Sequence, residues 1–351
     1  MRYLLAASWL AVALTAGTAA PVPKGTKGPW VGKPAFVKGP NVAFTITEEG
    51  GAVKKIPPRS QYSFIVTKVT EDRVEVFFAG KTTNSFSRDD VMRAAEAIDY
   101  YSTVLAGSPK DTYYLQARAE AYHAEDKLDA ADADYTRALE LDPTNVSFRM
   151  RRAAFRLEAK RFDKAIEDYD ALAAAHPSYK EWSLRQKAQA KAGLKKFDEA
   201  IADLTKALET TQNRTGILLS RGLLYSRAGA HQKALDDYAD IPANDPNYST
   251  AVNNIAWLRC TCPDEKFRNG KEAVELATKA CELTQWKNFG HIDTLAAAYA
   301  EAGDFEKAVK HQTDVMADAE LVKREGPELE ARLKLYQQKK PYRLPDETKK
   351  K

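Results

Sequence analysis

Alanine recurs along this chain at intervals close to 34 residues, and this spacing constrains the fold more than any other feature. Ala131 starts a series whose steps are 34, 35, 34, 39 and 35 residues: Ala165, Ala200, Ala234, Ala273 and Ala308. Ala97 lies 34 residues before Ala131 and belongs to the same series. A period near 34 is typical of stacked helix-turn-helix repeats, in which neighbouring helix pairs bury a continuous core. The sequence therefore predicts a mostly α-helical array of about six repeats.

The residue types inside each unit indicate how its two helices pack. One position of the first helix is always small: Ala119, Ala153, Ala188, Gly222 and Ala296. One position of the second helix is large: Tyr135, Tyr169, Leu204 and Tyr238. Antiparallel helices approach closely only where side chains are small, and bulky residues fill the gaps that remain. With Pro143, Pro177 and Pro246 near the unit ends, residues 89–322 resemble the tetratricopeptide family, which implies a right-handed superhelix.

Two repeats depart from this pattern at a position in the first helix. Arg156 and Lys191 stand where the other repeats carry Tyr122, Tyr225 and Tyr299. Either these two repeats pack less tightly, or the chain needs a charge there.

The N-terminus has the organisation of a secretory signal peptide over residues 1–20. Arg2 precedes a short apolar run at residues 4–14, and small residues follow at 16–20. A run of eleven residues is too short to cross a bilayer, and no later run reaches 18. We therefore expect an exported, soluble protein without a membrane span. Residues 21–40 are rich in Gly and Pro and are predicted to be a linker.

Between residues 41 and 88 the hydrophobic period changes to two, which predicts short antiparallel strands in a small β-barrel. The order of Ile56-Pro57, Val66, Asp72, Phe86 and Asp90-Val91 resembles bacterial Src-homology-3-like domains. In that family the barrel often binds cell-wall peptides. A barrel that only caps the helical stack is the alternative.

The C-terminal part resembles the last module of many secreted bacterial tetratricopeptide proteins, from the stretch at Cys260–Gly270 through Leu295–Phe305. A helix from about Pro327 to Lys339 is predicted to cap the array. Residues 323–351 are thus expected to form a capping helix and a basic, frayed tail.

Three cysteines in an exported chain leave one without a partner. We predict a Cys262–Cys281 disulfide, because Cys260 and Cys262 are too close in sequence to pair easily. Three free thiols are one alternative. A zinc site that adds His291 is another, although this spacing matches no common zinc pattern.

Catalytic and cofactor motifs are absent from the sequence. It contains no H-E-x-x-H, no G-x-S-x-G and no nucleotide-binding glycine cluster. Its 53 Lys and Arg nearly balance 49 Asp and Glu, and the signs alternate along the predicted helices. This distribution indicates solvated helix faces rather than a phosphate-binding surface. We expect no enzyme activity, no cofactor, no metal and no nucleic-acid partner.

In the tetratricopeptide family the first helix of each repeat lines a groove that holds a protein or peptide partner. Carried onto this chain, the resemblance implies these groove residues: Tyr113, Gln116, Glu120, His123, Met150, Trp182, Arg185, Gln189, Leu219 and Leu223. Tyr113, Trp182 and Arg185 are the expected anchors, because aromatic and Arg residues dominate interface energetics. The sequence therefore predicts a non-enzymatic scaffold acting outside the cytoplasm. Attachment to the cell wall through the barrel, with the repeats as a spacer, is the alternative function.

Overall fold

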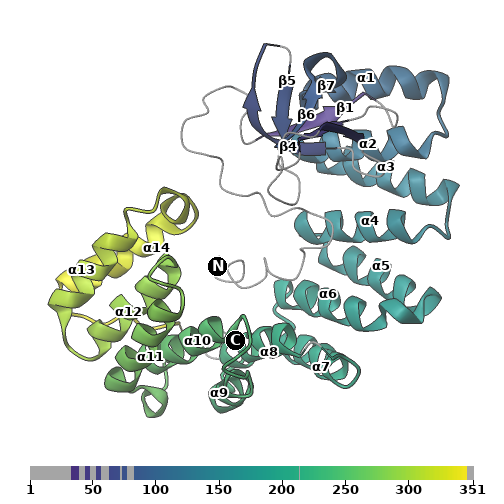
Figure 1. Ribbon diagram of the computed structural model, residues 1–351. Coiled ribbons are helices and arrows are strands. Elements are labelled where there is room, and N and C mark those ends of the chain that lie inside the picture. Colours follow the sequence, from purple (N-terminus) through teal and green to yellow (C-terminus); the bar gives the residue numbers. More distant parts are fainter. Residues whose placement is uncertain are drawn as a thin grey trace. The chain divides into compact units, whose positions relative to one another are not determined.

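A computed structural model describes residues 33–38, 44–47, 53–56, 63–71, 73–76, 83–212 and 214–345. The chain forms two compact units, Met1–Gly193 and Leu194–Lys351. The described residues form an antiparallel sheet followed by fourteen α-helices, which confirms the predicted fold class (Figure 1). The predicted signal peptide and most of the predicted linker lie outside the described residues.

The sheet of the first unit contains seven short strands among the described residues. They are β1 Pro34–Val37, β2 Phe44–Thr47, β3 Val53–Ile56, β4 Ser63–Val69, β5 Arg73–Val76, β6 Thr83–Ser87 and β7 Val91–Met92. Their order across the sheet is β3-β2-β6-β5-β4-β1-β7, and every pair is antiparallel.

The sheet begins earlier than the sequence predicted, because β1 falls inside the range expected to be linker. The short apolar run of β1 is followed closely by Gly39 and Pro40, which made it look like linker. It becomes a strand through distant partners: it pairs with β4 on one side and with β7 on the other.

Alternating residues of the central strands bury one apolar face of the sheet. Val66, Val74 and Phe86 are fully buried, and the Phe86 ring lies 4.8 Å from the ring of Phe64. Phe86 is therefore a core residue and does not line a groove. The resemblance to Src-homology-3-like domains stays a prediction.

The first helices pack directly on the sheet. Phe36 of β1 and Met92 of β7 share one buried cluster with residues of α1 (Ala94–Gly107) and α2 (Thr112–Ala124). The Tyr101 hydroxyl of α1 donates a hydrogen bond to the Val37 carbonyl at 2.5 Å. These contacts join the sheet to the first helices of the array.

The helices of each unit pack in chain order. The first unit continues with α3 Leu128–Leu141, α4 Val146–Glu158, α5 Phe162–Ala175 and α6 Lys180–Gly193, stacked side by side (Figure 1). The second unit contains α7 Phe197–Leu208, α8 Thr215–Arg227, α9 His231–Ala239, α10 Tyr248–Thr261, α11 Gly270–Leu283, α12 Phe289–Glu301, α13 Phe305–Val315 and α14 Ala319–Gln337.

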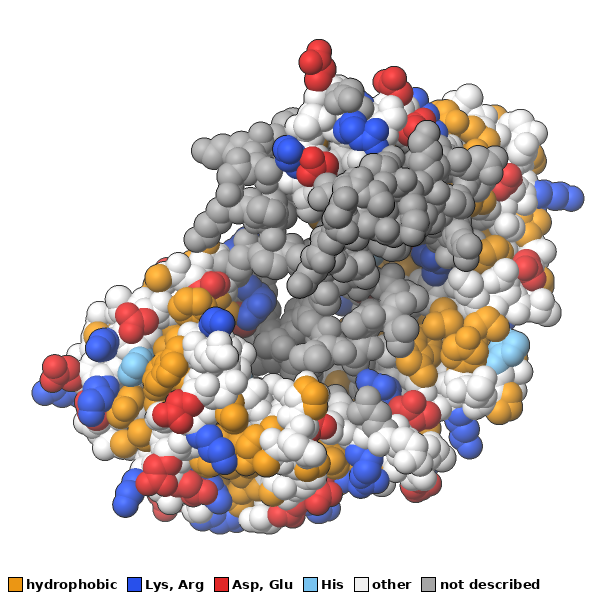
Figure 2. Space-filling model, viewed as in Figure 1, with side chains coloured by type: hydrophobic (Ala, Val, Ile, Leu, Met, Phe, Trp, Pro, Cys, Tyr) orange, Lys and Arg blue, Asp and Glu red, His pale blue; other side chains and the backbone are white. Residues whose placement is uncertain are grey.

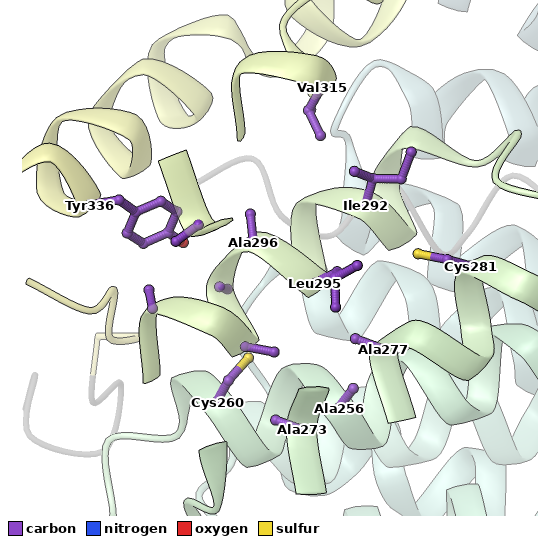
Figure 3. Close-up of a cluster of buried hydrophobic side chains, with 14 of the residues drawn as sticks. Ala256, Cys260, Ala273, Ala277, Cys281, Ile292, Leu295, Ala296, Val315 and Tyr336 are labelled. Carbon is purple, nitrogen blue, oxygen red and sulfur yellow. The ribbon is translucent and has the colours of Figure 1, made fainter. Parts of the chain in front are cut away.

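The small and large positions meet as the sequence predicted. A Cβ atom added to Gly222 of α8 would lie 2.6 Å from the Tyr238 ring of α9, so only glycine fits there without a shift. In the second unit, buried alanines of α10, α11 and α12 surround Leu295 (Figure 3). Close helix approach and bulky filling are therefore both present.

The turns that end the first helices share one backbone feature. The second residue beyond each of α2, α4, α6, α8 and α12 has a positive φ: Asp126, Lys160, Lys195, Gly229 and Gly303. In the turns after α2, α4, α8 and α12, an amide past the helix donates to a carbonyl five residues back, as Arg161 does to Arg156 at 2.7 Å.

The capping helix is longer than predicted. It starts at Ala319, where the Asp318 side chain accepts a hydrogen bond from the Leu321 amide at 2.7 Å. Pro327, expected near its start, lies inside it. Leu329 and Tyr336, which follow the proline, are fully buried, and their packing stabilises a helix that proline weakens.

The prediction of a Cys262–Cys281 disulfide is wrong in this structure, because Cys260, Cys262 and Cys281 are all buried, free thiols. Cys281 packs inside the apolar cluster of the second unit, and Cys262 lies beyond the end of α10, outside that cluster. Cys260 occupies a separate place in the cluster, with Leu295 drawn between it and Cys281 (Figure 3).

Candidate functional site

The predicted groove residues lie on α2, α4 and α6 of the first unit and on α8 of the second. On α2, Tyr113 is partly exposed and stacks edge-on against Tyr114, with ring centroids 5.1 Å apart. Gln116 is only 1% exposed, and its amide donates to the Thr112 carbonyl at 3.4 Å. Gln116 therefore presents no surface to a partner, because its side chain turns into the helix pair.

Two contacts connect the predicted face of α2 with α4. Glu120 forms an ion pair with Arg151 at 2.8 Å, and both side chains are partly exposed. The His123 ring packs edge-on against Phe155, with centroids 5.0 Å apart. These contacts hold partly exposed side chains of the two helices against each other. Arg151 belongs to this surface, although it is not one of the predicted groove residues.

Trp182 and Arg185 lie on α6, where both are partly exposed. The Trp182 ring packs against Tyr169 at 5.5 Å and shares a cluster with Leu157 of α4. The Arg185 guanidinium lies 3.7 Å from Glu181, one turn earlier. Met150 of α4 and Gln189 of α6 are partly exposed as well. In the second unit, Leu219 and Leu223 of α8 are also partly exposed.

A repeated ion pair joins the two helices of several repeats, and the sequence analysis missed it. Arg118 binds both carboxylate oxygens of Asp134, at 2.7 and 2.8 Å. The same 16-residue spacing recurs in Arg152–Asp168 and in Arg221–Asp237. Each arginine comes directly before the small residue of its first helix, so the 34-residue period carried this signal.

Arg156 explains one departure from the repeat pattern. Its side chain is buried between α3 and α5, where it donates to Asp132 and to Asp168, each at 2.8 Å. Arg152 also binds Asp168, and Arg161 also binds Asp132. The chain therefore uses a charge at this position, and the repeat is not loosely packed.

The electrostatics of this cluster favour the ionised form of Asp132. Burial raises the pKa of Asp132, but the hydrogen bond from Arg156 and the charges of Arg156, Lys164 and Arg161 outweigh it, so the pKa is lowered. The ion pairs of Arg156 lie between α3, α4 and α5 and connect these helices.

The three cysteines are buried, and burial affects their acidity. Burial raises the pKa of the Cys281 thiol to about 12 and that of Cys260 well above its usual value. Within the ranges that the structure describes, no group of three His, Cys, Asp or Glu side chains could hold a metal ion. The buried His291 ring donates a hydrogen bond from Nδ1 to the Ala280 carbonyl at 3.1 Å. Its nitrogens also lie 3.4 Å from the Thr284 hydroxyl and 3.2 Å from the Asn288 side-chain amide.

Surface charge is mixed in sign. Figure 2 shows Lys and Arg side chains intermixed with Asp and Glu over the described parts of the visible face. Among the described helices, none has the length and apolar character needed to cross a membrane.

Comparison with known proteins agrees with the repeat geometry. A family model described as tetratricopeptide repeat matches residues 112–145 and 186–214. The chain contains tetratricopeptide repeats. Serine/threonine-protein phosphatase 5 from Rattus norvegicus and from Homo sapiens are each 31% identical to the chain over 107 residues. That stretch is 30% of this chain, which spans about a fifth (21%) of the length of these curated relatives.

Two solved tetratricopeptide structures align with this chain at low identity. YrrB, "a TPR protein with an unusual peptide-binding site", has a TM-score of 0.39 and 18% identity, covering 55% of this chain and 95% of that one. A tetratricopeptide repeat protein from Parabacteroides merdae has a TM-score of 0.43 and 17% identity, covering 70% and 92%. Similarity this low gives no information about what this chain binds.

Proposed function

We propose that this chain is a non-enzymatic scaffold that presents its tetratricopeptide array to a protein or peptide partner outside the cytoplasm. The observation that carries the proposal is the face of α2, α4 and α6, where partly exposed Tyr113, Trp182 and Arg185 sit on rigidly packed helices. A rigid face binds with little ordering cost on the scaffold side, and aromatic and Arg side chains supply most interface energy. The leader-like residues 1–20 support the extracellular setting.

Site-specific photocross-linking in the native host tests this proposal. A photoreactive residue replaces Gln189, which is partly exposed on α6, and in a matched control replaces Glu167, which is exposed on α5. We expect position 189 to capture a discrete protein that position 167 does not. Trp182→Ala combined with Arg185→Ala should abolish that adduct. Because the Trp182 ring packs against Tyr169, circular dichroism must show that the double variant is still folded at the temperature of the experiment.

Three results would contradict the proposal. Identical adducts from both positions would show that the captured protein does not use this face. Enrichment of cell-wall material instead of a protein would favour attachment through the sheet. An intact N-terminus, found by mass spectrometry of the chain from its host, would contradict export.

A further inference from the structure

The segment that follows α14, Pro341–Pro345, packs against α10 and α12. The Arg343 guanidinium lies 2.5 Å from a Glu301 carboxylate oxygen of α12. The Leu344 amide donates a hydrogen bond to the Thr261 carbonyl, at the end of α10, at 2.9 Å. This segment was expected to be frayed, but it is held by a charge and by its backbone.

An aromatic and cationic recess holds Tyr342. Its ring centroid lies 6.0 Å from that of Trp257 on α10. The guanidinium of Arg332, on α14, lies 5.6 Å from the Tyr342 ring and 5.8 Å from the Trp257 ring. Arg332 is 1% exposed and is fixed by Asp293 of α12 at 3.1 Å. Cation–π and aromatic contacts of this kind stabilise a bound ring when the partners are already in place.

Trp257 stands at the same position of its repeat as two of the predicted groove residues, Gln189 and Leu223. Trp257 directly follows the fully buried Ala256, as Gln189 follows Ala188 and Leu223 follows Gly222. The C-terminal segment therefore lies on the face that corresponds, in this repeat, to the predicted partner-binding positions.

We propose that Trp257, Thr261, Glu301 and Arg332 form a peptide-recognition site for an extended segment in which an aromatic residue is followed by arginine. Tyr342, Arg343 and Leu344 fill this site within the same molecule. A partner segment of the same chemistry binds by displacing them. This inference rests on the proposed scaffold function and names the class of peptide that the second unit takes.

Occupation within one molecule reduces the apparent affinity for a free peptide. A tethered segment acts at an effective concentration on the order of millimolar, so a competing peptide must exceed that advantage. Weakening the internal segment should therefore raise the affinity for a peptide added in solution.

Fluorescence anisotropy on full-length chains tests the inference with a labelled peptide of the sequence Lys-Pro-Tyr-Arg-Leu-Pro, copied from residues 340–345. We expect the Tyr342→Ala/Arg343→Ala double variant to bind it about tenfold or more tightly than the unmodified chain does. Adding Glu301→Gln to the double variant should weaken binding again, and adding Glu306→Gln, an exposed carboxylate on α13, should not. A peptide with Glu in place of Arg should not bind.

Each remaining outcome overturns the inference. Equal affinity of the unmodified chain and the double variant would show that the segment does not occupy the site. No binding by a double variant whose circular dichroism and melting temperature are unchanged would show that the surface is not a peptide site. If the unmodified chain is a dimer in solution and the double variant is a monomer, the segment pairs with a second copy. Trp182→Ala with Arg185→Ala should leave the binding of this peptide unchanged, because both residues lie in the first unit. Failure of the peptide site can therefore be told apart from failure of the proposed scaffold function.

Discussion

The helix pairs around α4 and around α12 follow one plan but are held by different forces. In α4, Arg156 is buried and joins Asp132 of α3 to Asp168 of α5. At the corresponding position of α12, Tyr299 stacks on His311 of α13, with centroids 5.6 Å apart. The α12 region packs mainly alanines around Leu295, beside one ion pair between Asp293 and Arg332. The α4 region shares the buried carboxylates of Asp132 and Asp168 among several arginines. The repeat therefore fixes the backbone arrangement and leaves the chemistry between the helices free to vary.

The apolar region should be most sensitive to loss of volume. Leu295 is 1% exposed, so Leu295→Ala should lower the free energy of unfolding by about 4 kcal/mol through lost burial and a residual cavity. Urea unfolding measured by circular dichroism checks this value. Leu283, which is 49% exposed on α11, is the control, and Leu283→Ala should change stability by about 0.5 kcal/mol or less.

The charged region should be sensitive to loss of one partner. Arg156→Ala leaves two buried carboxylates with fewer cations and should cost about 3 kcal/mol, because Arg152 and Arg161 still neutralise part of the charge. Removing the exposed Arg137, which pairs with Glu140 at 3.0 Å, should cost well under about 1 kcal/mol. Equal losses for the two variants would mean that the buried network does not hold this region together.

Added volume should destabilise the charged region less than either deletion. Ala165 is fully buried beside Ala153 and Tyr169, so Ala165→Leu should cost about 2 kcal/mol by overpacking. Thermal melting gives the measurement, with substitution of the exposed Glu167 by Leu as the size-matched control. An unchanged melting temperature for Ala165→Leu would contradict the repeat register.

The smallest effect concerns pH and belongs to the second unit. Burial lowers the pKa of His291 below 6.5, with the hydrogen bond to the Ala280 carbonyl opposing the shift. The unfolded chain therefore takes up a proton first, so stability is full above pH 6.5 and falls as the pH drops toward the folded pKa. Urea midpoints between about pH 5 and 7.5 should show this loss, and His291→Asn should reduce the slope. A slope that the substitution leaves unchanged would assign the pH dependence to other groups.

The sequence predicted the parts of the fold that repeat and missed those that depend on distant partners. The alanine series located the helix pairs because close approach imposes a small residue such as Gly222 against a ring such as Tyr238. Strand β1 was missed because its partners lie at residues 63–65 and 91–92. The contact of Arg343 with Glu301 spans 42 positions, so no local pattern pointed to a docked segment.

The candidate site was predicted at the level of helices but not of every side chain. The partly exposed Trp182 and Arg185 lie on the first helix of a repeat, as the family pattern implied. Gln116 was placed on the groove by its position in the repeat, yet it is buried, and its amide donates to the Thr112 carbonyl of its own helix. The Arg118–Asp134 pair was readable from the period but looked like ordinary alternating surface charge.

The left-handed turns after the first helices have a consequence for engineering heat resistance. Gly229 and Gly303 adopt this conformation without steric cost, but Asp126, Lys160 and Lys195 hold it at φ values of 57, 59 and 61°. An L side chain in this region costs roughly 1–2 kcal/mol, which exceeds the roughly 0.5–1 kcal/mol that glycine loses through its greater freedom in the unfolded chain. Glycine at these three sites would relax the turns without altering any helix face. Because an array sums the stabilities of its units, three modest gains would combine into a more durable scaffold.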